Sequence, residues 1–176
     1  MRLWIDGQCF QTASANRGIG RYMYELIAAL SKFQPDIELM ISFNAGMPDE
    51  AIVARDELRK FIRPENMHIW HGGAKAGEVV EGYTDMRRAS ELALNHHVNL
   101  LAPDLALSAS PFEGAHDQAV PFVAGETSRI KTAAIFYDAI PKRFEREYLI
   151  TERHAAFYDR RLSLLENFDL LLCISD

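Results

Sequence analysis

The sequence predicts an α/β fold: a Rossmann-like parallel sheet flanked by helices. Short apolar segments alternate with helical segments along the whole chain, and no pattern typical of a β-hairpin interrupts them. Hydrophobic residues make up 48% and charged residues 25% of the 176 residues, which are ordinary values for a globular protein. A chain of this length can build one domain with a proper core. We therefore expect a single domain over residues 1–176.

The first half of the chain contains three strand candidates, at 2–9, 37–43 and 67–70, and a helix candidate after each. The helix that begins near Gly18 carries apolar residues at helical spacing. The next is expected from Pro48 to about residue 62, because proline suits the first helical turn and acids suit the positive end of the helix dipole. Thr84 and Asp85 are expected to cap the third. The apolar residues of that third helix are Met86, Ala89, Leu92, Ala93 and Val98.

The second half begins with a short strand candidate at 105–107. An irregular stretch follows, from 108 to about 128, and loops of that length in compact domains are usually functional or mobile. A strand is expected at 131–137 and helix from 142 to 168 in two pieces. An apolar strand at 168–174 closes the chain.

Charge and cysteine content narrow the class of protein. The net charge of -6 and the pI near 5.5 argue against non-specific binding of nucleic acid, which needs a basic surface. Cys9 and Cys173 end apolar runs, where small buried thiols are common, and two cysteines make neither a disulfide framework nor a zinc site. The sequence has no signal-peptide pattern and no window of about 20 apolar residues. We expect a cytoplasmic protein.

A glycine-containing segment between the first strand and the first helix is the strongest functional signal. Gly18 and Gly20 stand where the helix begins, and Arg21 follows them. Glycines let the backbone approach a ligand, a helix N-terminus suits phosphate, and an arginine fork suits a diphosphate. The segment is not G-x-G-x-x-G, and the preceding loop is too long for that fingerprint. A tight turn into the helix would explain the same glycines.

Two further segments place polar and aromatic side chains beyond strand ends. Phe112 and Glu113 lie in the long loop, where the ring could stack on a sugar and the carboxylate could accept hydrogen bonds from its hydroxyls. An ordinary Pro–Gly loop is the alternative. Tyr137 and Asp138 come at the carboxyl end of the strand expected at 131–137. Asp138 could orient an acceptor hydroxyl, cap the following helix or pair with Arg143.

Together these segments resemble the N-terminal domain of family-4 (group 1) retaining glycosyltransferases with the GT-B fold. The resemblance spans nearly the whole chain and rests on the order and spacing of its motifs. The residues that carry it are Asp6, Gly18, Gly20, Arg21, Tyr22, Leu26, Leu30, Ser110, Pro111, Phe112, Glu113, Gly114, Tyr137, Asp138, Ile140, Pro141, Phe144, Tyr148, Tyr158, Arg161, Leu162 and the run from Asp169 to Ser175.

This resemblance implies an acceptor-binding, Rossmann-like half of a two-domain enzyme that transfers a sugar from a nucleotide-sugar to a glycan or lipid-linked acceptor. It implies that Gly18, Gly20 and Arg21 reach the donor phosphates, and that no divalent metal or other cofactor is needed. Many members have a histidine where this chain has Tyr137. Asp138, with Tyr137 beside it, is therefore the expected catalytic position. The donor-binding domain is absent from these residues.

Two other functions fit the same residues. One is a stand-alone Rossmann-like module that binds a small ligand or carbohydrate without catalysis. The other is a different α/β enzyme with Asp138 and Glu113 as acid–base groups. The chain stops at the carboxyl end of an apolar strand, the edge at which open α/β sheets bind ligands. We therefore expect the native polypeptide to continue past Asp176; a fold that ends with this strand is the alternative.

Histidines and basic residues suggest two minor possibilities. No metal site is expected, because the adjacent His96 and His97 face different sides of a helix, and His68 and His71 are poorly placed as a pair. The helix expected from residue 48 to about residue 62 combines basic and apolar residues, which would suit peripheral contact with the inner face of a membrane. The acidic residues of the same segment dilute its positive charge, so an ordinary solvated helix is the preferred explanation. Its basic residues and the one that follows it are Arg55, Arg59, Lys60 and Arg63.

Overall fold

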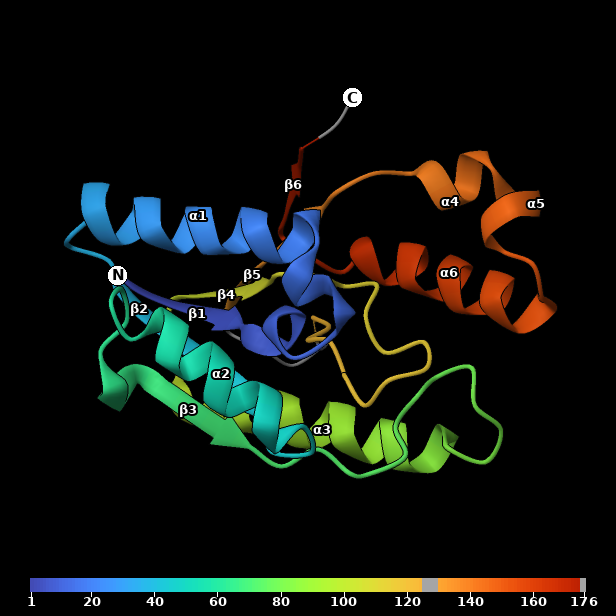
Figure 1. The fold of residues 1–176 in the computed structure, drawn as a ribbon, viewed down its shortest axis with the longest axis horizontal. Helices are drawn as coiled ribbons and strands as arrows, with labels where there is room; N and C mark the ends of the chain where they lie inside the picture. The colour runs from blue at the N-terminus through green and yellow to red at the C-terminus, as the bar shows by residue number, and fades with distance from the viewer. Residues whose placement is uncertain (125–129, 175–176) are drawn as a thin grey trace.

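A six-stranded, all-parallel sheet forms the centre of the molecule in a computed structural model that describes residues 1–124 and 130–174. The strand order is β3-β2-β1-β4-β5-β6 (Figure 1). The predicted Rossmann-like α/β class is confirmed. The strands are β1 (Arg2–Asp6), β2 (Glu38–Asn44), β3 (Met67–Trp70), β4 (Leu105–Ser108), β5 (Lys131–Phe136) and β6 (Leu170–Cys173). The helices are α1 (Gly18–Phe33), α2 (Pro48–Leu58), α3 (Thr84–Leu101), α4 (Ile140–Arg143), α5 (Glu145–Tyr148) and α6 (Glu152–Leu165), with 3-10 turns η1 (Gly7–Phe10), η2 (Ala13–Asn16) and η3 (Pro64–Asn66).

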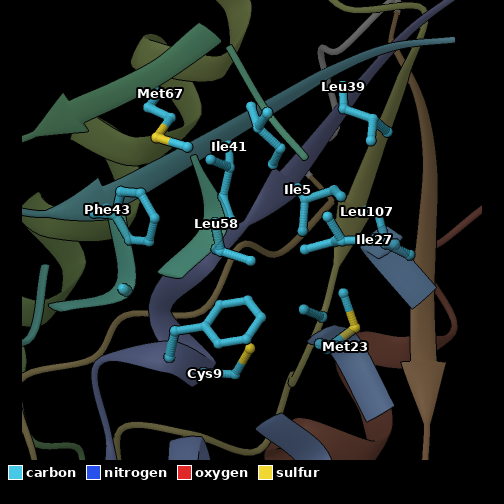
Figure 2. Close-up of a cluster of buried hydrophobic side chains, with 14 of the residues drawn as sticks. Ile5, Cys9, Met23, Ile27, Leu39, Ile41, Phe43, Leu58, Met67 and Leu107 are labelled. Atoms are coloured by element: carbon cyan, nitrogen blue, oxygen red, sulfur yellow. The ribbon is translucent and has the colours of Figure 1, made fainter. Parts of the chain in front are cut away.

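Helices α1 and α2 cover one face of the sheet. Ile5 of β1 and Ile41 of β2 point to this face, where they meet Met23 and Ile27 of α1 and Leu58 of α2 (Figure 2). All five side chains are fully buried. Burying aliphatic side chains of this size contributes roughly 1.5–3 kcal/mol each, so this layer fixes the position of α1 over the sheet.

Helices α3 and α6 cover the opposite face. Trp4 and Met40 point to it from the residues next to Ile5 and Ile41, as alternation along a strand requires. There they pack with Leu94 and Val98 of α3 and with Leu165 of α6. Strands with apolar residues on both faces are typical of a parallel sheet between two helical layers.

Three predicted elements end earlier or divide further than expected. β1 stops at Asp6, because the Asp6 carboxylate accepts a hydrogen bond from the Gln8 backbone N–H at 3.2 Å and starts the turn η1. α2 stops at Leu58, whose carbonyl accepts from the Ile62 N–H at 3.0 Å and turns Ile62 into the core. The predicted helix at 142–168 consists of α4, α5 and α6 rather than two pieces.

The buried face of α3 differs from the apolar pattern of its sequence. Met86 and Leu92 are exposed, whereas Arg87 and Ser90 are buried. Each inward polar group has a partner: Arg87 forms ion pairs, and the Ser90 hydroxyl accepts from the Gly73 N–H at 2.8 Å. Thr84 is the first helical residue and no side chain caps the helix, so the predicted cap is wrong.

The edge strand β6 is exposed along its whole length. Leu170, Leu171 and Leu172 are 50%, 40% and 38% exposed. Cys173 is exposed as well, which contradicts the expectation that both cysteines are buried. Cys9 is buried, and burial raises the pKa of its thiol well above the usual value.

Candidate functional site

The carboxyl edge of β1 carries the predicted glycine segment and a pocket of about 420 Å³. The pocket lies between the first turns of α1 and the helix α2, and it is named here the α1–α2 pocket. Gly20 and Arg21 line one side of it, and Asp49 and Glu57 line the other. The first turn of α1, which contains the two glycines and the arginine, lies beyond the carboxyl end of β1 (Figure 1).

Gly18 and Gly20 have different surroundings. A Cβ atom at Gly20 would lie 2.4 Å from the Ala15 carbonyl oxygen and 2.6 Å from that of Ser14, so only glycine fits there. A Cβ at Gly18 would meet nothing within 4 Å. No side chain caps α1 at Arg17. The first turn of α1 thus offers uncapped backbone N–H groups beside open space, the local arrangement that suits an anion.

Glu113 is buried against the segment that precedes α1. Its Oε1 atom accepts hydrogen bonds from the hydroxyls of Ser14, at 2.5 Å, and Ser110, at 3.0 Å. Burial raises the pKa of Glu113, and hydrogen bonds from Ser14, Thr12 and Ser110 oppose that rise. The predicted acceptor-binding carboxylate is therefore occupied by groups of its own chain, and it joins the loop after β4 to η2.

Phe112 lies among other aromatic rings. Its ring centroid is 6.0 Å from that of Phe136 and 4.8 Å from that of Tyr158. The side chain is half-buried and belongs to the layer between the sheet and α6. The predicted stacking partner of a sugar thus has rings of the protein beside it.

Tyr137 and Asp138 follow β5 and are both half-buried. The Tyr137 hydroxyl donates to the Ala109 carbonyl at 3.0 Å, and burial raises the pKa of this hydroxyl. Asp138 Oδ1 accepts from the Ile140 N–H at 2.9 Å. Of the three roles expected for Asp138, the structure shows the contact with the turn into α4. Asp138 and Glu113 have separate hydrogen-bond partners.

A buried network of amide side chains closes the carboxyl ends of β1 and β2, and sequence reasoning missed it. The Gln8 carboxamide donates to the Val120 carbonyl at 2.7 Å and accepts from the Val120 N–H at 2.9 Å. Asp6 Oδ2 accepts from the Phe122 N–H at 2.8 Å. These bonds fold the loop after β4 over the point where the strand order reverses, the usual ligand crevice of such sheets. The available signal was the pair of polar residues Asp6 and Gln8 inside the otherwise apolar strand expected at 2–9.

A second buried cluster of charges joins α3 to α6. Glu78 forms ion pairs with Arg161 and Arg160, each with an N···O distance of 2.8 Å, and with Arg87 at 3.6 Å. Arg161 is 1% exposed, and burial lowers its pKa while Glu78 and Glu91 oppose that change. A buried cation of this kind requires its carboxylate partners. These ion pairs connect α3 to α6 on the same side of the sheet as the hydrophobic cluster against which Phe112 packs.

Within residues 1–124 and 130–174, no group of three or more histidine, cysteine, aspartate or glutamate side chains is arranged to hold a metal ion. Over the same residues, no helix has the length and apolar character needed to cross a bilayer.

Comparison with known proteins does not assign the chain to a family. No protein-family model matches the chain, and searches of curated proteins and of solved structures found no match either. The residues themselves, and the fold that places them, therefore carry the functional argument.

Proposed function

We propose that this chain is the acceptor-side domain of a GT-B glycosyltransferase. The enzyme would transfer a hexose from a nucleotide-sugar to a glycan or lipid-linked acceptor, with retention, in the synthesis of surface polysaccharide at the cytoplasmic face of a membrane. The motif resemblance suggests this function. The observation that carries it is the first turn of α1, whose N–H groups lack a side-chain cap and whose Gly18 borders open space.

The donor diphosphate would lie against this first turn. Gly18 leaves room for a phosphate to reach the backbone, and Gly20 lets the turn pack on Ser14 and Ala15. Arg21 is exposed on the same turn and would add a guanidinium fork to a phosphate oxygen. Stabilising the departing negative charge is the main electrostatic task in such a transfer.

The acceptor hydroxyl would be oriented from the β5 end. Asp138 Oδ1 holds the turn into α4, so Oδ2 is the atom that would accept from the acceptor hydroxyl. Tyr137 fixes this turn through Ala109 and keeps its proton. In this proposal Glu113 holds η2 in place through Ser14. Phe112 has a packing role beside the rings of Phe136 and Tyr158.

The affinity of residues 1–176 for nucleotides tests the acceptor-side assignment. The proposal locates tight donor binding in a second domain, so calorimetry with UDP- and GDP-hexoses should give affinities no tighter than about 1 mM. Sub-micromolar binding by these residues alone would contradict the assignment.

A binding module without catalysis is the second candidate. The α1–α2 pocket favours it, because this pocket is well formed but lined by carboxylates that would repel a phosphate. Turnover of nucleotide-sugars by the native polypeptide distinguishes the two functions.

A further inference from the structure

The α1–α2 pocket combines carboxylates with aromatic rings. Asp49, Glu50 and Glu57 line it from α2, Tyr24 from α1, and Phe10 from η1. Its volume of about 420 Å³ lies within the roughly 300–1,000 Å³ of small-molecule sites. The lining thus offers both a flat apolar surface and a negative rim.

The charge of this lining is unbalanced. Three acidic residues and one basic residue, Arg21, line the pocket, and none of these four side chains forms an ion pair within the described residues. The nearby ammonium of Lys60 stands over the Tyr24 ring, 4.9 Å from its centroid.

Helix electrostatics explain only part of this charge. Asp49 and Glu50 lie in the first turn of α2, where the helix dipole favours acids. Glu57 lies in the last turn, where the dipole disfavours a negative charge. The helix dipole therefore does not stabilise a negative charge at Glu57, which is nevertheless one of the residues that line the pocket.

The opposite wall is held in place before any ligand arrives. Thr12 and Ala15 belong to this wall. The Thr12 hydroxyl accepts from the Ser14 N–H at 3.2 Å, and the Ser14 hydroxyl is bound to Glu113. A wall fixed in this way lowers the ordering cost of binding.

We propose that the α1–α2 pocket binds a small amine-bearing molecule. Its ammonium group lies between Glu57 and the carboxylates at the start of α2, and its ring lies against Tyr24. Amino sugars and simpler cyclic amines share this chemistry. The inference needs no nucleotide-sugar and no second domain, but the pocket shares Gly20 and Arg21 with the proposed donor-phosphate site.

A titration followed by backbone amide shifts tests the site, with glucosamine, glucose and cyclohexylamine as probes. Glucosamine should bind in the range of about 1–10 mM and shift the amides of the pocket lining. Glucose has the same ring and hydroxyls without the charge, so it should bind at least about tenfold more weakly, the lower end of what a charge-assisted hydrogen bond contributes. If cyclohexylamine binds with the same affinity as glucosamine, the pocket accepts amines in general. If cyclohexylamine binds more weakly, the pocket prefers amino sugars.

Glu57→Gln and Glu25→Gln form the matched pair of variants. Both residues are exposed, so both variants should fold. Glu57→Gln should weaken glucosamine about tenfold. Glu25→Gln removes the same charge from α1 outside the pocket lining and should leave the affinity unchanged. Equal binding of glucose and glucosamine, equal losses in the two variants, or no pocket shifts at about 50 mM glucosamine would each overturn the proposal.

Discussion

Gly20 stands where the backbone of the preceding turn leaves no room for a side chain. Gly20→Ala would place a Cβ 2.4 Å from the Ala15 carbonyl oxygen, so the free energy of unfolding should fall by about 2–3 kcal/mol. Gly18→Ala is the control, since its Cβ meets nothing within 4 Å and alanine favours helix; its effect should stay within about 1 kcal/mol. Urea denaturation of both variants measures the difference, and equal losses would refute the packing argument.

The buried carboxyl group of Glu113 should make the free energy of unfolding depend on pH. Burial raises its pKa in the folded protein above the ordinary value of about 4.3. The folded state then holds the proton more tightly than the unfolded state. This contribution to stability is fully present below the unfolded pKa and is lost as pH rises through the raised folded pKa.

Denaturation of the wild type and of Glu113→Gln as a function of pH isolates this contribution. The glutamine cannot ionise, so the wild type should lose stability relative to Glu113→Gln as pH rises above about 4.3. A difference that stays constant with pH, or has the opposite sign, would show that Glu113 is not the buried acid described here.

At the scale of elements, the attachment of α3 to α6 depends on Glu78. Glu78→Gln leaves the buried Arg161 without its nearest carboxylate, so the free energy of unfolding should fall by about 3 kcal/mol. Glu81→Gln three residues away breaks only an exposed pair with Arg153 and should cost less than about 1 kcal/mol. Thermal or urea unfolding that ranks the two variants equally would count against a structural role for this cluster.

The positions of the strands were predictable from the sequence. Which side of α3 is buried, and whether β6 is buried at all, were not. β3 has its predicted bounds, because an apolar run between turn residues has few other conformations. The inward face of α3 was not predictable, because Arg87 is buried only through carboxylates that lie close in space. The exposure of Leu172 was not predictable either, because an apolar strand is expected to be buried and the sequence does not show which helices cover it.

At the scale of the whole molecule, the position of the glycine segment in the fold was predictable from the sequence. The alternating elements bring Gly20 and Arg21 to the edge of the sheet expected for ligands, and both residues line a pocket there. The sequence could not show that Glu113 binds Ser14 or that Gln8 closes the strand crevice, since these are contacts between segments about 100 residues apart. Contacts of that range depend on the finished fold.

Turnover of nucleotide-sugars by the native polypeptide tests the proposed function most directly. With UDP- and GDP-hexoses and a glycan or lipid-linked acceptor, we expect acceptor-dependent release of nucleoside diphosphate. Arg21→Ala should slow it by about tenfold or more without changing stability, whereas Arg88→Ala, exposed on α3, should leave it unchanged. Absence of diphosphate release, or equal rates for wild type and Arg21→Ala, would contradict the glycosyltransferase account.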